Sequence, residues 1–479
     1  MARFLVVGTG PLIDEDGATF VSGQCLRTIH FVRPMLEAGH EVRLLTVPIP
    51  GTESGNSTSL ATRRLYGEDF AYHALTTHDE RRIVPALRRL MERTRFDGCV
   101  GINAYPAYLL ARAAPEIPFW ADLNGWTMAE GQTRAALVGH DQDYNHFWRM
   151  EAAVLLEADR FSTVSARQGD ALYGELALAG RLNGLTFNWS FASPVPNAVY
   201  PLYSKVSRGA GHPGWPERVP ADRPVVLWSG GFNTWTDVGM LTEALESAMA
   251  VSPSLFFAAT GGSVRGHDDQ TFERFRALAR DRLPGDRVAL LGWTATETVL
   301  ALHAGATVGI NIDSRNTETH FGARNRLTNM MGAGLPVATT RGTEIAAWIE
   351  TEKLGGIVDP GDSGALAQLL ADAAENRDTW ELRARAARER ALQDFAPEVT
   401  LREFLAWCGQ PRRAPDRDAE ALTPWQRREA EGLGPRVWTK IMVEGELGPL
   451  LEDRVALANL RRKLPLRAWY AIRKHVKGK

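Results

Sequence analysis

Short apolar runs alternate with longer, partly polar segments along the first half of the chain. The runs have the length of buried strands, which predicts β-strands at residues 4–7, 41–45, 98–102 and 118–123. The segments between them repeat apolar residues at helical spacing, which predicts helices at residues 24–38, 81–95 and 144–158. Strands that alternate with helices indicate a parallel, doubly wound sheet.

A stretch rich in proline and glycine, residues 194–224, interrupts this pattern and is typical of an interdomain linker. Beyond it, a second parallel sheet is predicted from strand-like runs at residues 225–228, 254–259, 288–291, 308–312 and 336–340. We therefore predict an α/β chain with two Rossmann-like domains facing each other across a cleft. The predicted boundaries are an N-terminal domain at 1–200, a linker at 201–223, a C-terminal domain at 224–409 and a charged linker with a helical tail at 410–479.

Length and composition agree with two folded domains. The 479 residues are too many for one hydrophobic core, and 44% hydrophobic with 23% charged residues is ordinary for a globular protein. A net charge of -2 gives no reason to expect a nucleic-acid partner. Cys25, Cys99 and Cys408 lie far apart, without a CxxC pair, which argues against a disulfide framework or a zinc site.

The sequence gives two expectations about location. No apolar run reaches the roughly 18 residues of a membrane-spanning helix, and the chain enters a strand-like run at residues 4–7 without a leader, so we expect a cytoplasmic protein. The last segment, 461–479, interleaves basic and apolar residues and contains no acid. It is either an amphipathic helix lying on the inner face of an anionic membrane or a solvated helix packed on the body, and Pro465 favours the second interpretation.

The first predicted strand ends in a glycine turn, Gly8-Thr9-Gly10. The third glycine of a GxGxxG dinucleotide motif is absent, because Ile13 stands there. A polar stretch follows, and Gly23 and Gln24 stand at the expected start of a helix. Backbone N–H groups and the helix dipole favour an anion there, so both residues are candidates for a phosphate or acceptor loop; a turn needed only for packing is the alternative.

A second glycine turn, residues 228–237, opens the second domain. Its two glycines expose backbone donors, and Asp237 falls where a carboxylate caps a helix. Its two tryptophans are costly to expose unless something flat covers them. The turn is therefore a candidate ligand site, although such turns also occur without a ligand. Its candidate residues are Gly230, Gly231, Asn233 and Trp235.

Residues 318–337 combine a loop carrying both signs of charge, a short helix and a Gly-Leu-Pro-Val entry into the next strand. Arg324 and Arg326 near a helix start have the donors to grip a diphosphate. Asn329 follows Arg326 by one helical turn, so both can face one ligand. Without further information, a structural loop with surface arginines is the competing interpretation.

Residues 317–337 resemble the donor-binding region of family 4-type (group 1) glycosyltransferases with the GT-B fold, and most closely a branch found in surface-polysaccharide or glycoconjugate gene clusters. Members show a glutamate, an aromatic-glycine step, Lys or Arg, a carboxylate one turn later and Ala-x-Gly-x-Pro-Val. The resemblance covers roughly residues 1–395. Further matching segments, in the expected order, are residues 121–125 with Glu130, 165–170, 180–183 and 228–237.

The resemblance implies transfer of a sugar from a nucleotide-diphosphate sugar to a glycan, lipid-linked saccharide or small-molecule acceptor, with retention of configuration and without a metal or other cofactor. Glu318 resembles the first glutamate of a paired-carboxylate region near the donor sugar, and Arg326 the basic residue on the diphosphate. Asn329 stands where the family places a carboxylate on the ribose hydroxyls, and an amide cannot supply two charged acceptors. The family's arginine and lysine after the first strand of the second domain are also absent here.

From the N-terminal domain, Asp122 and Asn124 are expected to face the cleft at the end of a strand. Asp122 is a candidate catalytic residue beside Glu318, as a base or an acceptor-orienting group; a buried capping aspartate is the alternative. DxD patterns at 14–16, 141–143 and 416–418 lie in polar stretches and are interpreted as surface loops rather than metal sites.

Two other functions remain open at this level. One is a GT-B relative that is not a transferase, such as a nucleotide-sugar epimerase. The other is a catalytically silent nucleotide-sugar-binding subunit, which Asn329 makes worth testing. A glucan phosphorylase is disfavoured, because the chain shows no lysine motif suited to a pyridoxal cofactor.

Overall fold

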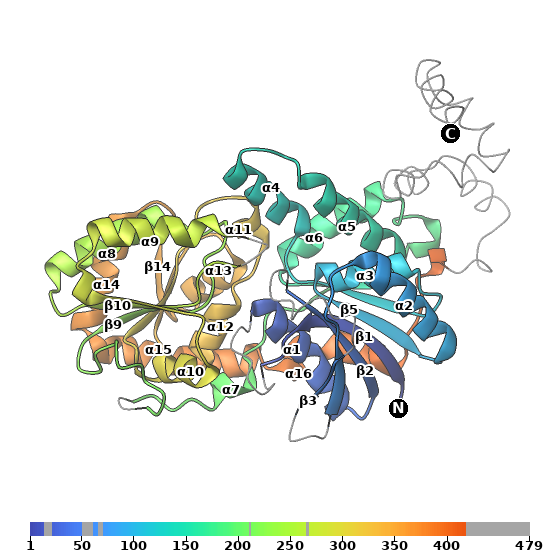
Figure 1. The fold of residues 1–479 in the computed structure, drawn as a ribbon, viewed down its shortest axis with the longest axis horizontal. Coiled ribbons are helices and arrows are strands. Elements are labelled where there is room, and N and C mark those ends of the chain that lie inside the picture. The colour runs from blue at the N-terminus through green and yellow to red at the C-terminus, as the bar shows by residue number, and fades with distance from the viewer. Residues whose placement is uncertain (14–21, 50–60, 66–69, 210–211, 265–267, 418–479) are drawn as a thin grey trace, which may run out of the picture.

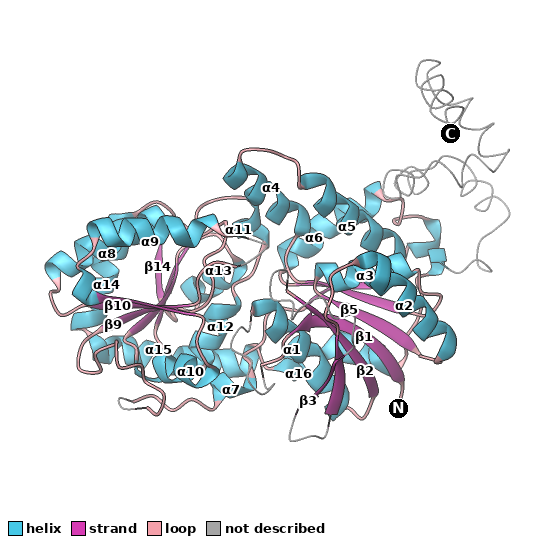
Figure 2. Cartoon of the chain, viewed as in Figure 1, coloured by secondary structure: helices cyan, strands magenta, loops and turns pink. Residues whose placement is uncertain are grey.

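Two sheets, each flanked by helices, organise the chain and lie side by side (Figure 1). The computed structural model describes residues 1–13, 22–49, 61–65, 70–209, 212–264 and 268–417. Strands run through the middle of each unit with helices on the outside (Figure 2). The predicted α/β class with two doubly wound sheets is confirmed.

The N-terminal sheet, within the described residues, consists of β1 (Arg3–Gly10), β2 (Glu41–Pro48), β3 (Ala61–Leu65), β4 (Phe70–Ala74), β5 (Gly98–Ile102), β6 (Phe119–Leu123), β7 (Arg160–Thr163) and β8 (Ala192–Pro194). Their order is β3-β4-β2-β1-β5-β6-β7-β8, and only the β3–β4 pair among them is antiparallel. Residues 4–7 of the central strand β1 are fully buried, because helices cover both faces of a parallel sheet.

The helices of this half are α1 (Gly23–Glu37), α2 (Glu80–Arg93), α3 (Ala104–Ala113), α4 (Thr127–Val138), α5 (Tyr144–Glu157) and α6 (Ala166–Leu178). Helices α1 and α6 begin at side-chain caps: Ser22 accepts from the N–H of Cys25, and Ser165 from the N–H of Gln168. These caps fix where α1 and α6 start, at the carboxyl edge of the sheet.

The C-terminal sheet is parallel throughout, in the order β11-β10-β9-β12-β13-β14. Its strands are β9 (Val225–Trp228), β10 (Phe256–Thr260), β11 (Val288–Gly292), β12 (Val308–Asn311), β13 (Val337–Thr340) and β14 (Gly356–Val358). A short helix, α7 (Pro201–Ser204), precedes it in the connection between the sheets. Its own helices are α8 (Val238–Val251), α9 (Gln270–Arg282), α10 (Thr296–Gly305), α11 (Thr317–Phe321), α12 (Asn325–Gly332), α13 (Glu344–Thr351) and α14 (Ser363–Glu375).

The chain returns to the first domain after α15 (Arg377–Asp394), which packs on α12 and α14. The next helices, α16 (Pro397–Thr400) and α17 (Arg402–Gly409), pack on α1. Phe404 of α17 lies edge-on to Phe31 and Trp120, with ring centroids 4.8 and 5.1 Å away. Residues 397–409 therefore complete the N-terminal core, which differs from the predicted boundary 224–409.

The sequence predicts a charged linker after α17, but ion pairs anchor the described part of this stretch to the N-terminal domain. Asp416 is 4% exposed, and its carboxylate pairs with the buried Arg181 at 2.5 Å. Arg417 pairs with Asp159 at 3.1 Å. The surface-loop interpretation of 416–418 is thus wrong for Asp416, because a buried arginine requires an acidic partner.

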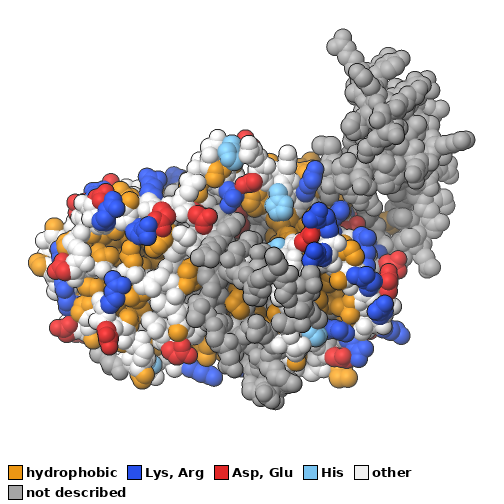
Figure 3. All heavy atoms as spheres, viewed as in Figure 1, with side chains coloured by type: hydrophobic (Ala, Val, Ile, Leu, Met, Phe, Trp, Pro, Cys, Tyr) orange, Lys and Arg blue, Asp and Glu red, His pale blue; other side chains and the backbone are white. Residues whose placement is uncertain are grey.

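Of the other predicted DxD segments and the tail, the structure describes only residues 141–143. Asp141 and Asp143 are exposed, as expected for a surface loop. Residues 14–16 and the basic segment 461–479 lie outside the described residues. Among the described helices, none has the length and apolar character needed to cross a bilayer. Figure 3 shows basic and acidic side chains interspersed over one face of both domains.

Candidate functional site

A cavity of about 610 Å³ lies between the two domains at the carboxyl ends of their strands. Its volume is within the range of about 300–1,000 Å³ that small-molecule sites occupy. Loops after β1, β6, β9, β10 and β11 line it, together with the first residues of α1 and α12. Of the residues that the sequence singled out, those that line the cavity are Gly23, Gln24, Asn124, Gly230, Gly231, Asn233, Trp235, Glu318, Arg324, Arg326 and Asn329.

The glycine turn after β9 is held against a second glycine turn that sequence reasoning did not single out. Gly230 has a φ of +102°, which favours glycine, and its N–H donates to Thr260 Oγ1 at 3.2 Å. A Cβ on Gly261 would lie 2.3 Å from the backbone of Gly230. The available signal was the pair Gly261-Gly262, which follows β10 as Gly230 and Gly231 follow β9. The two turns together place the backbone of Gly230, Gly231 and Gly261 in the wall of the cavity.

Arg326 is a charged group with an unused donor. Its Nη2 donates to the carbonyl oxygen of Gly231 at 2.5 Å, and its guanidinium lies 4.2 Å from the ring centroid of Trp228. Its buried Nη1 has no hydrogen-bond partner among the described residues. Burial lowers the pKa of Arg326 to about 10, so the side chain remains cationic at neutral pH. A guanidinium in this state is suited to a phosphate group.

Arg324, by contrast, is fully engaged in a buried ion-pair cluster. Its Nε donates to Asp313 at 2.6 Å, and its Nη1 and Nη2 donate to Glu318 at 2.9 and 2.7 Å. Burial alone would lower the pKa of Arg324, but the two carboxylates outweigh burial and raise it. The prediction that Arg324 grips a diphosphate is therefore corrected: two carboxylates already neutralise its charge.

Glu318, the predicted catalytic carboxylate, borders the cavity from this cluster. Burial raises the pKa of Glu318, and Arg324 opposes that effect. Both of its oxygens accept from Arg324. Glu318 thus holds the loop before α12 in place, and the geometry gives it no free oxygen to act as a base.

Asn329 is tied to the interdomain connection. Its Oδ1 accepts from the N–H of Tyr200 at 2.9 Å, and its Nδ2 donates to Asn325 Oδ1 at 3.0 Å. The side chain is 3% exposed. The amide therefore uses both of its functional groups on the protein, and this arrangement explains why an amide, with one donor and one acceptor, stands here.

Two helices, one from each domain, begin at the cavity. Gly23 is the first residue of α1 and Asn325 the first of α12. A Cβ on Gly23 would lie 3.6 Å from Asn325 Nδ2, so the two N-termini are adjacent. The first N–H groups of a helix lack intrahelical partners and its N-terminus carries partial positive charge. Together with Arg326, they create a positive potential in this part of the cavity.

Asp122 does not face the cavity, and its predicted catalytic role is corrected. It is fully buried, and its Oδ1 and Oδ2 accept from Arg27 at 2.7 and 3.0 Å. Ser162 also donates to Oδ1, at 2.6 Å. The carboxylate therefore balances a buried arginine, which corresponds to the structural alternative of the sequence analysis.

Asn124, from the same strand end, does line the cavity and is held by Asn103. Asn124 Nδ2 donates to Asn103 Oδ1 at 3.0 Å. Asn103 has a φ of +75°, and its Nδ2 donates to Thr9 Oγ1 at 3.1 Å and to the carbonyl of Gln24 at 3.0 Å. The network fixes Asn124 against the loop that starts α1.

Direct contacts join the domains at one end of the cavity. The carboxylate of Glu344, in the C-terminal domain, accepts from the N–H groups of Ala166 and Arg167 at 3.0 and 2.8 Å. Ser165 Oγ donates to the carbonyl of Phe321 at 2.6 Å. An acidic side chain from one domain thus caps a helix of the other, which holds the two cavity walls together.

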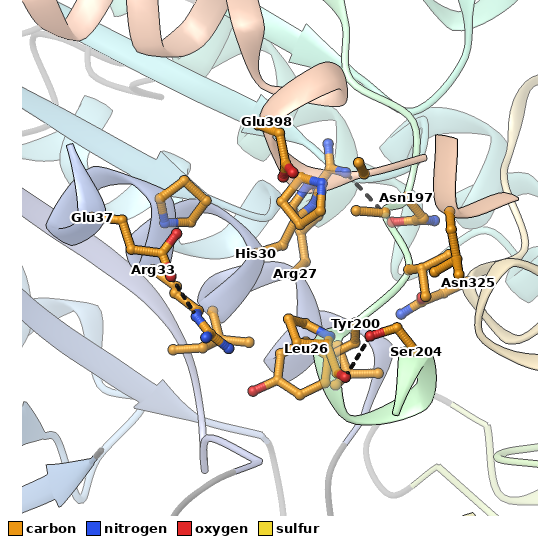
Figure 4. Close-up of a pocket in the computed structure, with 18 residues that line it drawn as sticks. Leu26, Arg27, His30, Arg33, Glu37, Asn197, Tyr200, Ser204, Asn325 and Glu398 are labelled. Atoms are coloured by element: carbon orange, nitrogen blue, oxygen red, sulfur yellow. Dashed lines mark hydrogen bonds and ion pairs between the residues drawn. The ribbon is translucent and has the colours of Figure 1, made fainter. Parts of the chain in front are cut away.

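A second cavity of about 340 Å³ lies behind α1, against the interdomain connection and α16 (Figure 4). Several of its polar side chains are engaged within the protein: Arg33 pairs with Glu37 at 2.8 Å, and His30 bonds Thr400 at 3.0 Å. Burial, with Arg27 nearby, lowers the pKa of His30 well below its usual value. The larger cavity, with its unused arginine donor, is therefore the candidate site.

Comparison with known proteins bears on the family and the fold of the chain. Residues 223–376 match the family of group 1 glycosyl transferases. No curated protein matches the sequence. Among solved structures, sucrose-phosphate synthase from Thermosynechococcus elongatus is similar at 16% identity and a TM-score of 0.66, over 85% of this chain and 99% of that chain. HepE from Anabaena, in complex with UDP-glucose, is similar at 15% identity and a TM-score of 0.61, over 85% of this chain and 100% of that chain.

A third similar structure is α,α-trehalose 6-phosphate synthase from Burkholderia multivorans, at 13% identity and a TM-score of 0.57, over 85% of this chain and 98% of that chain. At these identities the similarity shows the fold, which is GT-B. Together with the family match in the second domain, it identifies the chain as a glycosyltransferase of the GT-B fold, as the sequence predicts.

Proposed function

We propose that this glycosyltransferase takes its sugar from a nucleoside-diphosphate sugar and transfers it to an acceptor hydroxyl with retention of configuration. The observation that carries the proposal is Arg326, a cationic side chain in the cavity whose buried Nη1 lacks a partner among the described residues. The proteins of similar fold include HepE in complex with UDP-glucose, which supports the same donor class. We place the chain in the family 4-type branch by resemblance to polysaccharide-assembly enzymes.

In this proposal, the diphosphate lies between Arg326 and the adjacent N-termini of α1 and α12. The acceptor hydroxyl attacks the anomeric carbon as the bond from that carbon to the phosphate oxygen breaks. The leaving diphosphate takes the hydroxyl proton, and Arg326 stabilises the developing charge. Because a guanidinium and helix N-termini neutralise the leaving group, the transfer needs no resident metal. Among the described residues, no cluster of three His, Cys, Asp or Glu has the arrangement of a metal site.

The proposal is tested with UDP-, dTDP- and GDP-sugars and a panel of saccharide acceptors, using mass spectrometry to detect the glycosylated product. Wild-type protein is expected to form product with at least one donor, with and without EDTA. Arg326→Met is expected to lose that activity while keeping the wild-type melting temperature. Product formation that requires an added divalent metal contradicts the metal-independent mechanism.

The two alternatives give other outcomes in the same assay. An epimerase converts the nucleotide sugar into a stereoisomer without an acceptor. A silent binding subunit binds a nucleotide sugar in calorimetry but forms neither product nor free nucleotide. If no nucleotide sugar binds at all, the donor class proposed here is wrong.

A further inference from the structure

Glu130, in the first turn of α4, places a carboxyl group in the wall of the cavity that belongs to the N-terminal domain. Within the described part of the chain, no side chain or backbone group bonds this carboxyl. It lies against Gly125, whose φ is +106°; a Cβ there would lie 2.5 Å from Glu130 Oε1. The φ of Gly125 favours glycine, and a side chain there would also require the Glu130 carboxyl to move, so the turn after β6 and this carboxyl are in direct contact.

Most of the charged groups around Glu130 are carboxyls. Glu151 of α5 interacts electrostatically with Glu130 and with Glu175 of α6, and burial raises the pKa of both Glu151 and Glu175. Trp126 Nε1 donates to Glu175 at 2.9 Å, and Glu175 is not among the residues that line the cavity. His146 of α5 also lines the cavity.

Glu130 interacts electrostatically with Glu318 and Arg324, which line the cavity from the C-terminal domain. Arg324 is already shared between Glu318 and Asp313, so it gives Glu130 little compensation. The N-terminus of α4 favours a charged carboxylate, but burial outweighs it. Burial, with Glu318 as the second cause, raises the pKa of Glu130 to about 8. At neutral pH the group is therefore a neutral carboxyl with an O–H to donate.

We propose that Glu130 is a sugar-binding residue, whose neutral carboxyl donates a hydrogen bond to the sugar of the donor from the wall opposite Arg326. The inference rests on the proposed function and assigns the position of the sugar within it. Arg326 and the helix N-termini hold the diphosphate, which directs the sugar toward Glu318 and hence toward Glu130. A neutral carboxyl suits this place, because a carboxylate would add negative charge beside Glu318 and the diphosphate.

The test compares a nucleotide sugar with the free nucleoside diphosphate, by calorimetry on the full chain. UDP-glucose and UDP are the first pair of probes, and the GDP or dTDP pair is used if the donor panel selects it. Glu130→Ala is expected to weaken binding of the nucleotide sugar about tenfold, the loss of one hydrogen bond, and to leave the nucleoside diphosphate unchanged. Glu130→Gln keeps a neutral donor, so its affinity for both ligands is expected to stay within about threefold of wild type.

A pH series separates hydrogen bonding from a structural effect. Between about pH 7 and about pH 9, the wild-type preference for nucleotide sugar over nucleoside diphosphate is expected to fall, because Glu130 loses its proton. In Glu130→Gln the preference is expected to stay constant. Glu116→Gln, at an exposed glutamate outside the cavity, serves as the matched control and is expected to follow wild type.

Three results contradict the inference: equal weakening of both ligands in Glu130→Ala, no weakening of either, or a wild-type preference that does not change with pH. These three results count against the inference only when the nucleoside diphosphate binds wild-type protein. If neither ligand of any pair binds wild-type protein, the proposed function itself fails, and the two failures are thereby distinguished.

Discussion

The two walls of the cavity have opposite chemistry. The arginines that line it, Arg324 and Arg326, both belong to the C-terminal wall, together with the two glycine turns. The N-terminal wall presents the amide of Asn124 and the carboxyl of Glu130, and no lysine or arginine among its described lining residues. Charge and backbone donors suit a diphosphate, whereas neutral polar groups suit hydroxyls. In the proposed function, the C-terminal wall together with the N-terminus of α1 holds the diphosphate, and the neutral groups of the N-terminal wall contact sugar hydroxyls.

Arg324 supports the C-terminal wall. Of the substitutions predicted here, its replacement is expected to have the largest effect, which is a loss of unfolding free energy. Arg324→Met leaves Asp313 and Glu318 buried without a cation, which costs about 3–5 kcal/mol of unfolding free energy. Urea denaturation measures this loss. A variant as stable as wild type would show that the cluster does not hold the wall. Arg341→Met, at an exposed ion pair with Glu350, is the matched control and is expected to lose about 0–1 kcal/mol.

Arg326 is expected to affect turnover rather than stability. Arg326→Met is expected to lower kcat/KM about 10²–10³-fold, the usual effect of removing one donor that stabilises the leaving group. Arg326→Lys keeps the charge but loses the planar fork, so an intermediate rate is expected. Steady-state kinetics beside a melting curve measure both effects. Equal rates in the three proteins would exclude a role for this side chain in the reaction.

Asn124 tests the role of the N-terminal wall in substrate binding. Asn124→Ala removes a polar group from that wall and is expected to raise the acceptor KM about tenfold, with the donor KM unchanged. Kinetics with each substrate varied in turn test this division. An increase confined to the donor KM would show that Asn124, like Glu130, contacts the donor rather than the acceptor.

Asn329→Asp is expected to have the smallest effect. Aspartate still accepts from the N–H of Tyr200 but no longer donates to Asn325, whose amide can turn to donate instead. We expect donor affinity within about threefold of wild type, measured by calorimetry. A large gain in affinity would indicate instead that the position contacts the ribose in this protein.

The sequence predicted the layout of the cavity better than the state of its side chains. Apolar runs and glycine turns fall at fixed places along a doubly wound chain, so the loops that meet at the strand ends could be predicted. The different states of Arg324 and Arg326 could not be predicted, because Asp313 and Glu318 form ion pairs with Arg324, whereas Arg326 feels Asp313 only as a nearby charge. Asp122 is similar: its partner Arg27 lies on another element.

Glu130 and Asp416 depend on contacts that are still more distant in sequence. The raised pKa of Glu130 has burial as its main cause, with Glu318 of the other domain as the second. Asp416 is buried because the chain returns to Arg181 of the first domain after the second is complete. Local sequence patterns carry no information on such pairs.

The most direct test of the account compares UDP with UMP, or the corresponding pair of the preferred base, by calorimetry on wild type and Arg326→Met. If Arg326 binds the diphosphate, the terminal phosphate improves the affinity of wild type strongly, and most of that gain disappears in the variant while UMP affinity is retained. If the variant weakens both nucleotides equally, or keeps the gain from the terminal phosphate, Arg326 does not hold the diphosphate and the central claim is wrong.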